Sequence, residues 1–216
     1  MNSMPLYLHD LLVFLASVAM VAIYHLLLWL RTRRQPDYAV HLFNFVVRRH
    51  WAEGVMHNPD VLGVQTLRNS TMAASFMAST AVLLTIGVLS LASQADKLAQ
   101  TWHALNFMGS AHPGLWIGRL MLLVIDLMAA FFCFTVSVRF FNHVGYMVTM
   151  PVDARPPHLT PELAGRYLNR AGNYFSLGSR IFYFSIPLVF WLFGSPYLLL
   201  STAGLLGALY FIDRSP

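Results

Sequence analysis

The sequence predicts an all-α membrane protein, a polytopic helical bundle of four or five transmembrane helices. Hydrophobic residues make up 57% of the 216 residues and charged residues only 11%, whereas a soluble domain carries about 25% charged residues. The charges lie between long hydrophobic runs, so the net charge of +5 indicates membrane topology and argues against a nucleic-acid partner. The spans leave almost no sequence for a soluble domain, so residues 1–216 are expected to form a single integral membrane domain.

Five hydrophobic runs account for the expected spans, since one crossing needs about 20 residues. They cover residues 11–30, 71–93, 115–138, 174–193 and 197–212. The last run follows a break at Gly194-Ser195-Pro196 and has only 16 residues, which leaves a fifth span and half of a re-entrant hairpin as alternatives. A fifth span is favoured, because a hairpin would carry Asp213 and Arg214 to the far side of the membrane.

The distribution of positive residues predicts the orientation. The segments around the first and third connections hold eleven Arg residues, whereas the second connection has only Lys97, with Arg119 just inside the next run. By the positive-inside rule the Arg-rich connections are cytoplasmic, and the N-terminal end with Asp10 lies outside. The second connection, residues 94–114, contains Trp102 and is expected to lie at the membrane interface. The expected location is the cytoplasmic (inner) membrane of a bacterium.

Two helices are expected to begin in the cytoplasm and to continue into the membrane. Asn58-Pro59-Asp60 and Thr160-Pro161-Glu162 each combine a capping side chain, a first-turn Pro and a first-turn acid. A helix from Pro59 to Ser93 would be about 52 Å long at 1.5 Å per residue, and the hydrocarbon core is only ~30 Å thick. When these two helix starts are aligned, residues 11–93 correspond to residues 115–193. The correspondence is either a weak internal duplication or a chance similarity in capping chemistry.

Six short blocks lie within or beside the second, third and fourth runs. They read QTLRNS at 65–70, SVRFF at 137–141 followed by His143, TMP at 149–151, LNR at 168–170, SLGSR at 176–180 and FYFSIP at 182–187. Together they closely resemble the integral-membrane family called domain of unknown function 599, over about residues 48–213. The resemblance implies a membrane fold and location but no reaction, because the family has no assigned activity. The first span lies outside the resemblance.

Asp126 is the charged residue whose position within a hydrophobic run most needs an explanation. It lies at the centre of the third run, where a carboxylate costs ~2.5–3.5 kcal/mol on insertion scales. It is either an ion or proton site or one half of a structural ion pair that fixes two helices. Arg180, about two turns inside the fourth run, could snorkel to the interface or pair with Asp126 or Asp213, and an anion site is the other interpretation.

A second polar group is expected at one depth, the cytoplasmic edge of the membrane. Its members come from the second, third and fourth spans and are Arg68, Asn69, Arg139, Asn142, His143, Asn169 and Arg170. Contact with lipid phosphate explains such a group most simply. A ring that attracts anions into a vestibule, or a docking surface for an acidic partner, are the alternatives.

Several histidines are weak candidates for a metal or haem site. His50, Glu53 and His57 have the spacing of one helix face, which would bring three metal ligands together. His25 and His143 lie toward the cytoplasmic ends of their spans, as axial haem ligands could. In both cases solvated or hydrogen-bonded histidines are the simpler interpretation.

Small residues recur four apart in two spans, which lets helices approach closely. The steps are Ala74 with Ala78, Ser75 with Ser79, Ala203 with Gly207, and Gly204 with Ala208. Packing within the chain is the first interpretation. Contact between copies through the last span is the second.

No arrangement of nucleophile, base and acid, and no phosphate loop, is recognisable, so the chain is not expected to be an enzyme. The leading function is an oligomeric channel or transport-type protein with an Arg-lined cytoplasmic entrance, since so few spans cannot enclose a pathway within one copy. An accessory or structural subunit of a larger membrane complex is the alternative, and a metal- or haem-binding protein is a weaker one. The expected partners are membrane lipid and either further copies or other membrane proteins, with no cofactor.

Overall fold

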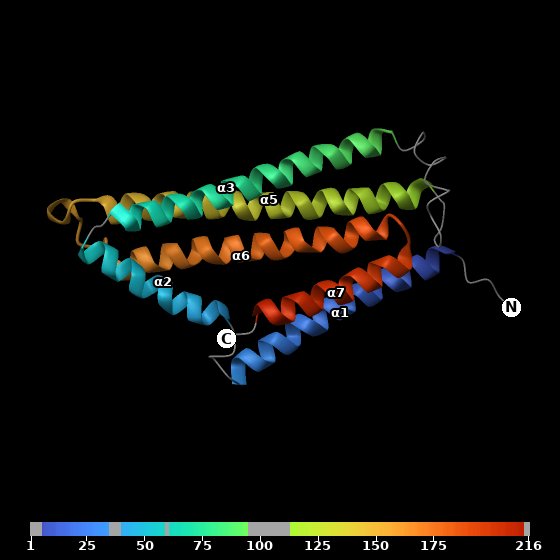
Figure 1. Ribbon diagram of the computed structural model, residues 1–216, viewed down its shortest axis with the longest axis horizontal. Coiled ribbons are helices and arrows are strands. Elements are labelled where there is room, and N and C mark those ends of the chain that lie inside the picture. Colours follow the sequence, from blue (N-terminus) through green and yellow to red (C-terminus); the bar gives the residue numbers. More distant parts are fainter. Residues whose placement is uncertain (1–5, 35–39, 59–60, 95–112, 214–216) are drawn as a thin grey trace. The chain divides into compact units, whose positions relative to one another are not determined.

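The computed structural model describes residues 6–34, 40–58, 61–94 and 113–213. Within these ranges every regular element is a helix and none is a strand, which confirms the all-α fold (Figure 1). The helices are α1 (Leu6–Arg34), α2 (Val40–His57), α3 (Val61–Ser93), α5 (Pro113–Thr149), α6 (Pro161–Trp191) and α7 (Ser195–Asp213), with a short 3-10 turn at Val152–Ala154.

Four of these helices are long and apolar enough to cross a membrane, as in a membrane protein. They are Leu8–Arg34, Val61–Ser93, Gly114–Thr149 and Ser195–Asp213, which match the expected first, second, third and last spans. The expected span 174–193 is not among them, because Arg180 and a series of hydroxyl-bearing residues lower the hydropathy of α6. The last helix is longer than predicted, with 19 residues, because Ser195 and Pro196 begin it and do not merely precede it.

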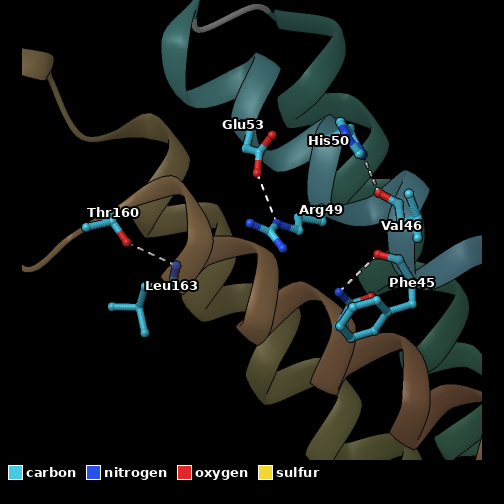
Figure 2. A network of polar contacts seen from close by, with 8 residues as sticks. Phe45, Val46, Arg49, His50, Glu53, Thr160 and Leu163 are labelled. Atoms are coloured by element: carbon cyan, nitrogen blue, oxygen red, sulfur yellow. Dashed lines mark hydrogen bonds and ion pairs between the residues drawn. The ribbon is translucent and has the colours of Figure 1, made fainter. Parts of the chain in front are cut away.

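The two helix starts behave as predicted where the structure describes them. The helix α6 begins at Pro161 and continues without a break to Trp191, and α3 is unbroken from Val61 to Ser93. Figure 2 shows the cap of α6, in which the backbone N–H of Leu163 donates to Oγ1 of Thr160 at 3.3 Å. Residues 59–60 of the other start, and residues 95–112 of the connection predicted to be interfacial, lie outside the described residues.

The helix α5 extends further than predicted. It has 37 residues and is therefore about 55 Å long at 1.5 Å per residue. The sequence led us to expect a helix that ended near Val138, and only α3 and α6 were expected to exceed the membrane. Because Gly145 is tolerated inside the helix, nothing stops α5 before Met150 and Pro151.

The chain divides into two compact units, and α3, α5 and α6 each contribute to both. Unit 1 contains α1, α7 and residues 83–93, 113–128 and 181–191. The helix α7 lies along α1 (Figure 1). One core cluster of unit 1 consists of aliphatic residues from α3, α5 and the position just after α6, namely Val88, Leu120, Leu123, Leu127 and Leu192.

Unit 2 contains α2 and residues 61–82, 129–149 and 161–180 of the three shared helices. Its core combines small and large residues from all four helices, including Ala52, Met56, Ala74, Val144 and Ala171. Ser137 of α5 donates to the backbone carbonyl of Ala171 at 2.8 Å. Close packing and this hydrogen bond therefore hold α5 against α6 within the unit.

The small-residue steps differ in exposure, and on α3 the step Ser75 with Ser79 is exposed. Ala74 and Ala78 are buried within unit 2, as expected for packing inside the chain. The steps in α7 are exposed, and a Cβ added at Gly204 or Gly207 would meet no described atom within 4 Å. The α7 steps therefore do not serve packing within the described part of the chain.

Candidate functional site

A buried ion pair joins α1 to α5 in unit 1. Nη2 of Arg119 donates to Oδ2 of Asp10 at 2.7 Å, and each residue is only 3% exposed. Nη1 of Arg119 donates to the backbone carbonyl of Trp191 at 3.1 Å. The hydroxyl of Ser195 donates to the other oxygen of Asp10. These hydrogen bonds satisfy both charges, as a buried ion pair requires if it is not to destabilise the fold.

The turn between α6 and α7 makes this arrangement possible. Gly194 has a φ of 145°, a conformation that favours glycine. The reversal places Trp191 and Ser195 on the same ion pair. The indole of Trp191 stacks on Phe14 of α1, with ring centroids 5.0 Å apart. Sequence reasoning missed this site, although Asp10 and Arg119 were both expected near the outer face of the membrane and carry opposite charges.

Asp126 has no such compensation. It is half-buried in α5, and its Oδ2 atom is buried with no hydrogen-bond partner among the described residues. Arg119 lies seven residues earlier, about 10 Å along the helix, and its charge is already matched by Asp10. Asp213 accepts from the hydroxyl of Tyr24 at 2.6 Å, which joins α7 to α1. The predicted pairing of Arg180 with either acid stays a prediction.

The predicted polar group of unit 2 is exposed, with one exception. Arg68 of α3, Arg139 of α5 and Arg170 of α6 are all exposed, as are Asn69, Asn142 and His143. The guanidinium group of Arg170 lies over the ring of Phe140, 5.8 Å from its centroid. Asn169 differs, because it is buried and its Nδ2 donates to the backbone carbonyl of Phe45 at 3.2 Å. It therefore joins α6 to α2 and does not contribute to the exposed group.

Arg155 stabilises two helix ends in unit 2. From the sequence alone it was only one of the eleven arginines that predict the orientation. Its Nη1 atom donates to the carbonyl of Met56 in the last turn of α2 at 2.6 Å. Its Nε atom donates to the carbonyl of Met150, just after α5, at 3.1 Å. A positive charge at two helix C-termini is favourable, because unpaired carbonyl groups gather there.

The candidate metal ligands on α2 are not brought together. Glu53 forms an ion pair with Arg49 at 3.1 Å, and Nδ1 of His50 lies 3.0 Å from the carbonyl oxygen of Val46 (Figure 2). Both side chains and His57 are on α2 as expected. In the part of the chain that the structure describes, no three His, Cys, Asp or Glu residues form a group that could hold a metal ion.

The two candidate haem ligands belong to different units. His25 of unit 1 lies 2.9 Å from the carbonyl oxygen of Val21 through Nδ1 and contacts Tyr24 and Phe184. His143 of unit 2 is exposed and meets the ring of Tyr167 edge-on at 6.2 Å. Each histidine therefore has the local aromatic and backbone contacts expected of a packing residue.

A family model described as "Protein of unknown function, DUF599" matches residues 12–216. The chain belongs to this family. The DUF599 match includes the first span, so the resemblance of residues 48–213 was too short at its N-terminal side. Searches of the curated proteins and of the solved structures found no match. DUF599 membership therefore agrees with a membrane protein and supplies no reaction.

Proposed function

We propose that this DUF599 protein is a non-enzymatic, oligomeric channel or transport-type protein of the bacterial inner membrane. Its pathway passes Asp126, and its cytoplasmic entrance is lined by arginines. The observation that carries the proposal is the buried Oδ2 atom of Asp126, which has no hydrogen-bond partner among the described residues. Ionisable groups within a span are unfavourable there, and they mark ion and proton pathways or structural pairs.

A structural ion pair is the less supported of these two roles for Asp126. Arg119, the nearest cation on the same helix, is held by Asp10 and by the carbonyl of Trp191. A structural role for Asp126 would need a hydrogen-bond donor at Oδ2, and the described residues supply none. A carboxyl group that exchanges an ion or a proton with a transient water-filled path has no need of such a donor.

The entrance is formed by the exposed arginines of unit 2. Residues on either side of Arg68 in α3 and of Arg170 in α6 line one cavity, together with Phe141, two residues after Arg139 in α5, so the three arginines belong to one level of the unit. None of the three forms an ion pair within the described ranges. Unpaired guanidinium groups at one level raise the local concentration of anions.

The pathway requires several copies, because four apolar helices are too few to surround one. The exposed face of α7 supplies a contact surface for a further helix. A groove of about 390 Å³ lies between α6 and α7 and is lined almost entirely by apolar side chains, including Phe190, Leu200, Gly204 and Ala208. Small residues on an exposed helix face permit close approach of a second helix.

The test is ion flux through reconstituted protein. Vesicles containing the wild-type chain are expected to dissipate an imposed proton or chloride gradient faster than empty vesicles. Asp126→Asn is expected to reduce this flux at least tenfold and to leave the thermal unfolding midpoint nearly unchanged. The control is Asp153→Asn, which removes an exposed acid of the loop after α5. A strongly lowered unfolding midpoint with unchanged flux would contradict the pathway and would assign Asp126 a structural role.

The same α7 groove also favours the second candidate, an accessory subunit that packs against another membrane protein. Gly204→Leu fills the surface of the groove, whereas Gly87→Leu adds the same side chain at another open position, on α3. Purification from native membranes followed by mass measurement separates the candidates. Loss of a symmetric oligomer in Gly204→Leu alone supports the channel, and loss of a different protein supports the accessory subunit.

A further inference from the structure

Unit 2 contains a cavity of about 330 Å³ that is lined by both polar and apolar residues. Arg48 and Trp51 of α2 lie on its wall, with Thr66 and Ser70 of α3. The remaining lining is mostly apolar and includes Phe141 of α5 and Phe175 of α6. The volume is at the small end of the range for ligand sites, which is about 300–1,000 Å³.

Arg48 is the group that gives the cavity its charge. Its side chain is half-buried and forms no ion pair among the described residues. None of the described residues that line the cavity is acidic. Desolvation by burial lowers the pKa of Arg48 below its ordinary value, yet an arginine keeps its charge in proteins. A buried charge is unfavourable unless a counter-charge meets it.

Gly172 of α6 allows the guanidinium group to lie where it does. A Cβ at position 172 would be 2.2 Å from Cζ of Arg48 and 2.4 Å from Nη1. The group therefore rests directly on the backbone of α6, and any side chain there would displace it. Gly165, two turns earlier, makes only ordinary contacts at 3.5 Å with Arg49.

The other polar groups suit a ligand that both accepts and donates hydrogen bonds. The hydroxyls of Thr66 and Ser70 donate to the carbonyls of Leu62 and Thr66, at 2.9 Å and 3.0 Å. Their oxygen lone pairs can still accept from a hydroxyl group of a ligand. The five N–H groups of Arg48 and the indole N–H of Trp51 are donors only, and guanidinium geometry matches phosphate bidentately.

We propose that this cavity binds an anionic phospholipid, with the lipid phosphate on the Arg48 guanidinium and the start of an acyl chain against Phe141 and Phe175. Lining residues of the cavity flank the exposed Arg68 on α3 and Arg170 on α6, at the level that the sequence predicts for the cytoplasmic edge of the membrane, where lipid phosphate lies. The inference makes no use of Asp126, and it assigns the lipid phosphate to Arg48 and not to the three arginines of the proposed entrance.

The test measures lipid affinity of the full chain in an uncharged detergent. The probes are short-chain phosphatidylglycerol, short-chain phosphatidylcholine and inorganic phosphate, and the readout is the shift of the thermal unfolding midpoint with probe concentration. Only phosphatidylglycerol is expected to stabilise the wild-type chain. Stabilisation by inorganic phosphate to the same extent would overturn a lipid site, and stabilisation by phosphatidylcholine to the same extent would overturn recognition of net negative charge.

Two pairs of variants assign the effect to this cavity. Arg48→Gln should raise the apparent Kd for phosphatidylglycerol about 10- to 100-fold, whereas Arg49→Gln removes the same charge from an exposed neighbour and should have little effect. Gly172→Ala keeps the charge and displaces the guanidinium group, so it should weaken binding too, and Gly165→Ala should not. The new methyl of Gly172→Ala meets only the flexible end of Arg48, so this variant keeps the test valid if Arg48→Gln fails to fold. Equal affinity in Gly172→Ala and Gly165→Ala would overturn the proposal.

Discussion

Arg119 and Asp10 form a buried ion pair, 2.7 Å long, between residues that are 109 positions apart in the chain. The pair joins α1 to α5, and Arg119 also donates to the carbonyl of Trp191 at the end of α6. Three segments of unit 1 thus meet at one guanidinium group. A pair with its remaining hydrogen bonds satisfied is weakly stabilising as a whole, but removal of one partner leaves an uncompensated buried charge.

Asp10→Asn is therefore expected to destabilise the protein by about 3 to 5 kcal/mol, because Arg119 stays charged without a carboxylate. The measurement is unfolding in detergent, with Asp153→Asn as the control for loss of an exposed acid. The double variant Asp10→Leu with Arg119→Met should recover much of the loss, since no charge then remains buried. If Asp10→Asn unfolds like the wild type, the ion pair has no structural role.

Arg155→Gln is expected to lower the free energy of unfolding by about 1.5 to 3 kcal/mol, the range for hydrogen bonds to a charged group. The change removes charged donors from the carbonyls of Met56 and Met150. Arg139→Gln removes an exposed arginine of the same unit and serves as the control. Equal unfolding midpoints for the two variants would argue against stabilisation of the helix ends.

The start of α6 should become less stable in acid. The pKa of Glu162 is lowered from 4.5 by hydrogen bonds from its own backbone N–H and from the Thr160 hydroxyl, and by nearby Arg49 and Arg166. A lowered pKa means that the ionised form is favoured in the folded state, so the stabilisation is present above pH 4.5 and is lost as the pH falls through the folded pKa.

Glu162→Gln should therefore unfold at a lower temperature than the wild type at neutral pH, and the difference should shrink as the pH falls below 4.5. Unfolding midpoints of both chains across that range measure the effect. Asp153→Asn, in the exposed turn before α6, controls for general acid sensitivity. A difference that is constant with pH would show that the Glu162 charge is not responsible.

The predicted orientation can be tested by labelling with a membrane-impermeant maleimide in intact cells. His9→Cys and Asp153→Cys introduce thiols at exposed positions near the start of α1 and after α5. Only His9→Cys should react, because the Arg-rich segments are expected in the cytoplasm. The native Cys133 is buried and provides no background. Labelling of Asp153→Cys alone would reverse the topology.

The helices of this protein were largely predictable, because local signals determine where helices begin and end. Thr160-Pro161 marks the start of α6, and Gly194 marks the reversal after it. The predicted lengths of α5 and α7 were wrong, and the physical reasons are also local. The sequence around Gly145 does not end α5, and Ser195 with Pro196 forms the first turn of α7.

The candidate site was predictable only in part. Asp126 was evident because a single acid interrupts an apolar run. The Asp10–Arg119 pair joins residues 109 positions apart, and the contact of the Arg48 guanidinium group with Gly172 joins residues 124 positions apart. No local pattern in the sequence specifies such contacts. Asn169 looked like its exposed neighbour Arg170, yet one residue of helix rotation turns its side chain toward α2.

The long separation between Asp10 and Arg119 also sets an order of assembly. A ribosome adds about 5 to 20 residues per second, so Arg119 is made between about 5 and 20 seconds after Asp10. During that interval α1 exists without its counter-ion. Asp10 lies in the second turn of α1, beside the helix start and not at its apolar middle, so its carboxylate can remain hydrated at the membrane surface until α5 arrives. Unit 1 can therefore close only after the third long helix is made, and Ser195 completes the ion pair only when the last helix begins.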